Sequence, residues 1–214
     1  MEHKDTKERI LMTASALFAQ SGYRAVSMRA ICAGADVSLP MIAYYFGNKA
    51  GLYEAVLQSL TGSFDRELDA IELENVPVHK KLRVYLEAAA RTHLKNPYFS
   101  GVFGHEAHPS DVLMKVMQSG TNRYFGDYIA HLISEVQQGG GLRADIDPLY
   151  AARIVSAIFN SHPTMSSLYE AFYKKRPDPE KILDAVIEFC LGALENERSA
   201  ASTPVRNFNA RHSE

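Results

Sequence analysis

Cysteines and long apolar runs are both scarce in this sequence of 214 residues. Cys32 and Cys190 are its two cysteines; they lie far apart and each sits in a segment of helical apolar periodicity, which favours buried thiols over a disulfide framework. No run of 18 or more apolar residues occurs, and the N-terminus MEHKDTKERI is charged and lacks the apolar stretch of a signal peptide. We therefore expect a cytoplasmic globular protein that does not contact a membrane.

The motifs of the common enzyme classes are missing as well. The sequence contains no GxGxxG or GxxxxGK[ST] phosphate loop, no HExxH and no GxSxG. We therefore expect neither enzymatic activity nor a cofactor.

One pair of histidines leaves a metal site open as an alternative. His105 and His108 are three residues apart and could hold a metal ion if His93 or Glu106 joined them. The simpler interpretation is that both histidines end a helix before Pro109. No resident metal is predicted, and a metal-responsive protein stays an alternative.

Charge of either sign is nearly balanced, with a small asymmetry along the chain. The formal net charge is -2, yet residues 1–50 hold six Lys and Arg against four Asp and Glu. This N-terminal excess of positive charge permits a polyanionic partner without requiring one.

What the sequence does contain is helical periodicity over nearly its whole length, and no segment alternates with period two. A first helix is predicted over 5–21, with Asp5 and Glu8 as a capping box and Gly22 as the stop. Ser27 caps a second helix over 27–34, and Ser38 caps a third over 38–45, with Pro40 in its first turn. The predicted fold class is all-α.

The remaining helices are predicted to form a larger body. Asn48 caps a fourth helix that leads away from the N-terminal head. Further apolar-periodic segments follow at 78–94, 98–107, 111–137, 147–172 and 179–196. We divide the chain into a head at 1–47, a body at 48–197 and a polar tail at 198–214 that is expected to be disordered.

The two short helices at 27–34 and 38–45, joined by a tight turn, predict a helix-turn-helix, whose second helix enters the major groove of double-stranded DNA. The stretch VSLPMIAYYFGNK then makes chemical sense: Leu39, Pro40 and Ala43 can contact thymine methyl groups. Tyrosine hydroxyls and Lys49 can donate to phosphate oxygens. An equally simple interpretation places Tyr44 and Tyr45 in the core.

Residues 8–57 resemble the DNA-binding domain of the TetR family of transcriptional regulators. The resemblance rests on ERILMTASALFAQSGYRAV followed by SMRAICAGADVSLPMIAYYFGNKAGLYEAVL. The segments NPYFSGVFGHEAHPSD and YYFGNKAGLYEAV are similar to the CecR-like branch of that family.

The resemblance implies roles for individual residues of the head. Ser27 and Arg29 would reach a phosphate or a base edge, with guanine as the natural partner of an arginine. The predicted base contacts and backbone contacts around the second short helix are Ser38, Leu39, Pro40, Ala43, Tyr44, Tyr45 and Lys49. Two positions depart from the family: Asp36 stands where glycine is usual in the turn, and Ala43 where many members carry a tyrosine.

For the body, the resemblance implies a small-molecule effector and a homodimer. The candidate effector contacts are the aromatic residues Phe99, Phe103, Tyr124 and Tyr128, together with His162, and they suit an apolar or planar molecule. The last two long helices carry apolar stripes that predict the dimer surface: Ile154, Ala157, Ile158, Ile182, Ala185, Val186, Phe189 and Ala193. A dimer spaces its recognition helices about one DNA turn (~34 Å) apart.

The sequence thus predicts a ligand-responsive DNA-binding regulator, most simply a repressor of a palindromic operator, with the effector acting on the head through the fourth helix. An activator has the same sequence features. The other class that stays open is an all-α small-molecule binding protein or enzyme that does not bind an operator.

Overall fold

The computed structural model describes residues 2–104, 110–118, 123, 127–175 and 177–195 of the chain. Within these ranges the protein is built from helices, and its extended contact is an isolated bridge between Leu142 and Glu195. The all-α prediction is confirmed. None of the described helices combines the length and the apolar character that crossing a lipid bilayer would need. The predicted tail at 198–214 lies outside the described residues.

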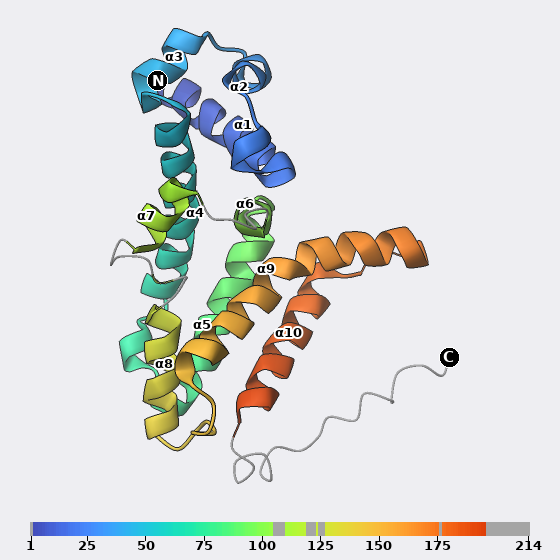
Figure 1. The fold of residues 1–214 in the computed structure, drawn as a ribbon. Coiled ribbons are helices and arrows are strands. Elements are labelled where there is room, and N and C mark those ends of the chain that lie inside the picture. Colours follow the sequence, from blue (N-terminus) through green and yellow to red (C-terminus); the bar gives the residue numbers. More distant parts are fainter. Residues whose placement is uncertain (1, 105–109, 119–122, 124–126, 176, 196–214) are drawn as a thin grey trace.

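Three helices form the head at one end of the molecule (Figure 1), namely α1 (Glu2–Ala25), α2 (Met28–Ala35) and α3 (Leu39–Phe46). Gly22, the predicted stop, leaves the helical conformation with φ 75° and ψ 161°, but helical residues continue beyond it and α1 ends at Ala25. The predicted start at Asp5 is wrong: α1 already begins at Glu2, so Asp5 lies inside the helix and does not cap it.

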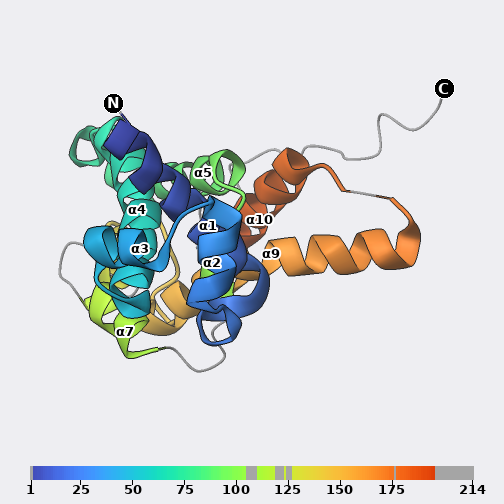
Figure 2. The same cartoon turned by 90° about the horizontal axis from the view of Figure 1, so that it is seen from above.

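The long helix α4 (Lys49–Asp69) connects the head to the body and runs along one side of it (Figures 1 and 2). Its start is fixed as predicted, since the Asn48 side chain accepts a hydrogen bond of 3.0 Å from the N–H of Gly51. The short 3₁₀ turn η1 (Leu73–Asn75) follows, and the chain then turns back into α5 (Val78–Lys95).

The body is completed by α6 (Phe99–Gly104), α7 (Asp111–Gln118), α8 (Asp127–Gln138), α9 (Pro148–Tyr173) and α10 (Pro179–Leu194). Asp147 and Asp178 cap the last two helices, and a proline occupies the first position of each, where its missing N–H costs nothing. Both views in Figures 1 and 2 show the C-terminal part of α9 projecting away from the other helices.

The prediction of one segment over 111–137 is wrong, because α7 and α8 are separate helices with Arg123 outside both. The Arg123 side chain bonds to the carboxylates of Asp65 at 2.9 Å and Asp69 at 2.8 Å on α4. The backbone carbonyl of Arg123 accepts a hydrogen bond of 2.9 Å from the Tyr85 hydroxyl. These polar contacts hold Arg123 against α4 and α5. They join residues far apart in the chain, which apolar periodicity cannot reveal.

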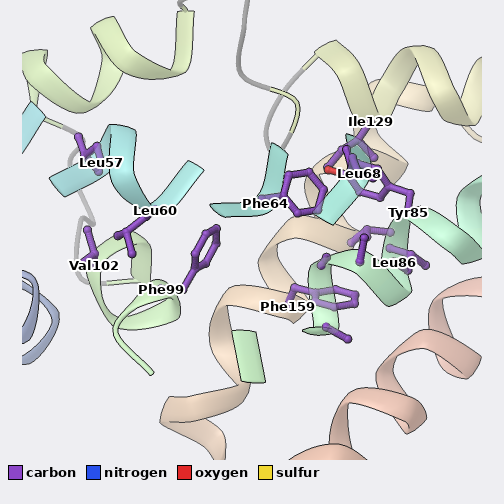
Figure 3. Packing of buried hydrophobic residues seen from close by; sticks show 14 of the residues in the cluster. Leu57, Leu60, Phe64, Leu68, Tyr85, Leu86, Phe99, Val102, Ile129 and Phe159 are labelled. Carbon is purple, nitrogen blue, oxygen red and sulfur yellow. The ribbon is translucent and has the colours of Figure 1, made fainter. Parts of the chain in front are cut away.

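One hydrophobic core runs through head and body, with α4 as its shared wall. Figure 3 shows Leu57, Leu60, Phe64 and Leu68 of α4 beside side chains from the body helices. Those neighbours come from α5, α6, α8 and α9, and they are Tyr85, Leu86, Phe99, Val102, Ile129 and Phe159. The head is therefore packed directly against the body through the shared helix α4.

A second contact between head and body is made by α6, which packs against α1. A side chain on Gly101 would place its Cβ 2.7 Å from the carbonyl oxygen of Ala19, so only glycine permits this approach. The coupling between head and body was predicted to run through the fourth helix, and the structure adds this direct contact between α1 and α6.

Candidate DNA-binding site

The helix-turn-helix begins with a capped α2 and turns at Asp36. The Ser27 hydroxyl oxygen accepts a hydrogen bond of 3.1 Å from the N–H of Ala30, as its predicted cap role requires. Asp36 adopts the left-handed conformation with φ 50° and ψ 55°, which aspartate enters more readily than most residues. The departure from glycine at this position is therefore accommodated without changing the turn.

The two short helices are anchored on their inner faces, α2 by α1 and α3 by α4 and α2. Ile31 and Ala35 of α2 and Ile42 of α3 are completely buried. The Arg9 side chain donates a hydrogen bond of 2.9 Å to the carbonyl of Ala35, the last residue of α2. Because these contacts hold the inner faces of α2 and α3, the outward face of α3 is presented in one orientation.

The outward face of α3 includes four of the residues predicted to contact DNA. Leu39 is 52% exposed and Tyr44 is 78% exposed, and Pro40 and Ala43 are exposed beside them. Tyr45 differs from Tyr44, because it is half-buried and packs against the core. Large side chains that gather on one exposed helix face mark a surface suited to contact another molecule.

Ser38 precedes α3 in the extended conformation of an N-cap, but its side chain makes no capping hydrogen bond. Its exposed hydroxyl lies at the end of the helix that the helix-turn-helix arrangement points at DNA. Arg29, in the first turn of α2, is exposed as well.

A hollow of about 710 Å³ opens between α2 and α3. Two charged side chains line it, Arg29 and Asp36. The rest of its lining is small or apolar and consists of Cys32, Ala33, Val37, Ser38 and Leu39. The hollow therefore offers one cation and one anion within a largely apolar surface.

Lys49 lies at the start of α4, where its side chain is held within the head. Its Nζ is 4.7 Å from the centroid of the Tyr23 ring and donates a hydrogen bond of 3.3 Å to the carbonyl of Arg24. Burial lowers the pKa of this ammonium group. The contact of Lys49 with a DNA phosphate stays a prediction. It would use the N–H groups of the ammonium that do not point at Tyr23 or at the carbonyl of Arg24.

The predicted effector residues fall into two aromatic groups of the body. Phe99 is fully buried and its ring lies 5.0 Å from that of Phe103 and 4.9 Å from the ring of His93. Tyr128 lies apart from them, 6.0 Å from the ring of Tyr85, and burial is the main cause that raises its pKa. The effector role of these three predicted residues stays a prediction.

Several predicted positions cannot be placed. Tyr124, His105 and His108 lie outside the described residues, and the side chain of His162 is not described either. Among the residues that are described, no three His, Cys, Asp or Glu side chains converge into a possible metal site.

The predicted dimer residues lie on α9 and α10 and leave apolar surface uncovered in the single chain. Phe189 is 68% exposed and Ile154 is 59% exposed. The alanines of the two stripes, Ala157, Ala185 and Ala193, are exposed too, while Ile158, Ile182 and Val186 are half-buried.

Sequence reasoning missed part of the surface around α3. Met41 is 37% exposed on that helix, and Cys32 and Val37 line the hollow. Helical spacing could have predicted that Met41 is exposed, because residues three positions apart share a helix face and Tyr44 is exposed. The hollow itself arises from the angle between two helices, which has no signal in the sequence.

Taken together, the capped α2, the turn at Asp36 and the outward face of α3 define an all-helical protein with a helix-turn-helix head of the DNA-binding type. The sequence agrees with that class, because residues 10–56 match the profile of the bacterial regulatory proteins, tetR family. Residues 10–56 therefore carry the DNA-binding domain of the TetR family of transcriptional regulators.

Two curated relatives are similar over part of their length. The HTH-type transcriptional repressor BdcR of Escherichia coli (strain K12) is 28% identical over 129 residues, which is 58% of this chain and 65% of BdcR. The probable HTH-type transcriptional regulator YttP of Bacillus subtilis (strain 168) is 36% identical over 64 residues, which is 30% of this chain and 31% of YttP. Both matches span less than two thirds of the relative.

Solved structures share the whole fold. The hemolysin II transcriptional regulator HlyIIR aligns with a TM-score of 0.67 at 18% identity, over 91% of this chain and 99% of its own. The fatty acid degradation regulator FadR from Bacillus halodurans aligns with a TM-score of 0.68 at 18% identity, over 88% and 99%. At this identity the likeness concerns the fold alone. The resemblance to the CecR-like branch is not tested by these relatives and stays a prediction.

Proposed function

We propose that the protein is a transcriptional repressor that binds a palindromic operator as a homodimer and is released by a small apolar or aromatic effector. The observation that carries the proposal is the outward face of α3, whose exposed Leu39 and Tyr44 sit on a helix anchored from behind by Ile42. A carrier protein or an enzyme has no need of an exposed, groove-sized helix in this position. BdcR, a repressor, supports repression over activation.

In the proposed complex, α3 lies in the major groove and α2 crosses the backbone. Arg29 would contact a guanine edge, and Ser27, Ser38 and Tyr44 would contact phosphates. Tyr45 and Lys49 make intramolecular contacts and would reach the DNA backbone from within the head.

The proposed dimer forms through α9 and α10, which would pack as a four-helix arrangement with the same helices of a second copy. The exposed Ile154 and Phe189 support this surface, because large apolar side chains on neighbouring helices are stabilised when a partner removes them from water. The two-fold axis of such a dimer explains why the expected operator is a palindrome.

The proposed effector acts by preferring one separation of the two heads. Its differential affinity for the two states sets how much operator binding weakens. Two connections could carry this change, namely α4 and the contact of Gly101 on α6 with Ala19 on α1. In this scheme the protein acts by binding and catalyses no reaction.

The proposal is tested by selecting bound sequences from a random duplex pool with the purified full chain, at two salt concentrations, and repeating the selection with Arg29→Ala. We expect an enriched palindrome with half-sites about one helical turn apart, and a relaxed preference at one position with Arg29→Ala. A pool without enrichment at either salt concentration would refute operator binding and favour a small-molecule binding protein or an enzyme.

A further inference from the structure

The recognition helix α3 has an unusual chemical surface for a helix that reads bases. Its sequence, LPMIAYYF, contains no charged residue and no Asn, Gln, Ser or Thr. Side chains of those types make the common hydrogen bonds to base edges. Tyr44 and Tyr45 carry the hydrogen-bonding side-chain groups of this helix, and Tyr45 is turned toward the core.

Van der Waals contact is therefore the main route by which α3 can distinguish bases. In the major groove the prominent apolar group is the methyl on C5 of thymine, and 5-methylcytosine presents a methyl group at the same place. Leu39 is the aliphatic side chain that both projects from α3 and lines the hollow.

The hollow between α2 and α3 has the composition that a methyl group requires. Cys32, Ala33, Val37 and Leu39 supply its apolar walls. Its two charged side chains, Arg29 and Asp36, are of opposite sign, so the hollow has no net charge with which to attract a phosphate. A base edge fits this surface better than the DNA backbone does.

Arg29 adds a second element to the same hollow. Its guanidinium can donate two hydrogen bonds to the O6 and N7 atoms of guanine. Because Arg29 and Leu39 line one hollow, a duplex that covers the hollow would bring them to the same or to neighbouring base pairs.

We propose that the helix-turn-helix reads the C5-methyl group of a pyrimidine next to a guanine, with Leu39 as the methyl contact and Arg29 as the guanine contact. This inference rests on the proposed function and adds a ligand class to it. The protein would then treat 5-methylcytosine as it treats thymine, so that cytosine methylation would alter its affinity for DNA.

The test uses the full chain and the duplex enriched in the selection described above. Each thymine of the half-sites is replaced in turn by deoxyuridine, which removes the methyl group and keeps the base pairing. Burying one methyl-sized group contributes about 0.8 kcal/mol, so we expect about a fourfold loss of affinity at the contacted position. Cytosine placed there should bind weakly, and 5-methylcytosine should recover about the same factor.

Two controls separate a direct contact from an effect on duplex shape. Deoxyuridine in the sequence flanking the half-sites should leave the affinity unchanged. Leu39→Ala should abolish the difference between thymine and deoxyuridine, while Leu94→Ala, which changes an exposed leucine of α5, should preserve it. A shape effect would persist in Leu39→Ala and would overturn the inference.

The two proposals fail in different ways. If no duplex is enriched, the proposed function and this inference are both refuted. If a duplex is enriched and binds equally well with deoxyuridine at every thymine, the protein is an operator-binding regulator and only the methyl contact is refuted.

Discussion

At the scale of single residues, Arg29 and Lys49 should contribute to DNA binding in different ways. Arg29 is an exposed side chain at the hollow, whereas Lys49 lies over Tyr23 and bonds to a backbone carbonyl. We expect Arg29→Ala to weaken specific binding by about 1–3 kcal/mol. Lys49→Ala should lower the salt dependence of binding by about one unit of slope. Affinity measured at several salt concentrations checks both.

The comparison needs unrelated DNA as its control. Losing a base contact changes the preference for the operator, whereas losing a phosphate contact weakens binding to every duplex by about the same factor. Equal losses for both variants on unrelated DNA would contradict the assignment of Arg29 to a base.

The two cysteines provide a chemical footprint of the same surface. Cys32 is half-buried and lines the hollow, whereas Cys190 is buried and burial raises the pKa of its thiol to about 11. Since the thiolate is the reactive form, iodoacetamide at pH 8 should modify Cys32 and spare Cys190 in the folded protein.

Operator DNA should slow the modification of Cys32 severalfold, because the bound duplex covers the hollow. The rates are measured by mass spectrometry with the selected operator and with a scrambled duplex as control. An unchanged rate in the presence of saturating operator would argue against α3 as the DNA-facing helix.

At the scale of elements, the junction between α3 and α4 depends on Gly51. A Cβ on this residue would lie 2.1 Å from the carbonyl oxygen of Phe46, the last residue of α3. We expect Gly51→Ala to push the two helices apart and to lower the free energy of unfolding by about 1–3 kcal/mol. Thermal or urea unfolding measures this change.

Gly62 on the same helix is the matched control. A Cβ there would meet only the Arg66 guanidinium, at an ordinary distance of 3.7 Å. Gly62→Ala should therefore raise the free energy of unfolding by about 0.5–1 kcal/mol, because alanine lowers the conformational entropy of the unfolded chain. If both variants changed stability equally, the close approach at Gly51 would not matter.

The packing of α4 against α5 includes a carboxylate whose ionisation should affect stability. Glu67 bonds to Lys95 Nζ at 2.5 Å and to Arg91 Nε at 3.4 Å. The hydrogen bond from Lys95 is the main cause that lowers the pKa of Glu67. Because the folded pKa lies below the unfolded value, this stabilisation is present above the unfolded pKa of about 4.3 and is lost as the pH falls through the folded pKa.

Glu67→Gln should therefore be less stable than the wild type at pH 7, by a few tenths to about 1 kcal/mol because Lys95 is largely exposed. The difference should shrink as the pH falls below about 4. Urea unfolding at pH 7 and pH 3 measures it. In a Lys95→Met background the substitution should have a smaller effect at pH 7, and an undiminished effect would assign the role to Arg91.

At the scale of the whole molecule, the dimer proposed for α9 and α10 predicts a self-association that a single charge can disrupt. Phe189 is 68% exposed in the single chain, so Phe189→Asp costs the monomer little. In a dimer the carboxylate would be buried against apolar surface, and we expect dissociation to monomers in sedimentation equilibrium.

Met12 supplies the control, because it is 60% exposed on α1, in the head. Met12→Asp should leave the dimer intact. If Phe189→Asp also remained a dimer, the association would have to use another surface. If the wild type sedimented as a monomer at every concentration, the dimer itself would be refuted.

Much of the local structure could be predicted because its causes are local. Ser27, Ser38 and Asn48 occupy the N-cap positions at which they were predicted, and Gly22, the predicted stop, leaves the helical conformation within α1. Helical spacing is also consistent with a buried Ile42 beside the exposed Leu39 and Ala43 of α3. Each of these features depends on residues three or four positions apart, and the sequence displays that relation directly.

The failures concern contacts between distant residues. Periodicity over 111–137 predicted one segment, and the bonds of Arg123 to Asp65 and Asp69, 58 and 54 positions away, lie where it is interrupted. The start of α1 at Glu2 was missed because Asp5 and Glu8 also suit the interior of a helix. Nothing in the sequence relates Lys49 to Tyr23, or Gly101 to Ala19.

By itself, the sequence determined the helical class, the N-caps of α2, α3 and α4 and most of the residues on the outer face of α3, because period, caps and turns are properties of neighbouring residues. Only the tertiary structure decided that α6 packs directly on α1. It also decided that the Lys49 ammonium group contacts the Tyr23 ring and the carbonyl of Arg24 within the head. It also decided that Arg29 and Leu39 share one hollow. These three outcomes depend on how helices cross and how closely they approach, which is set by the packing of side chains far apart in the chain.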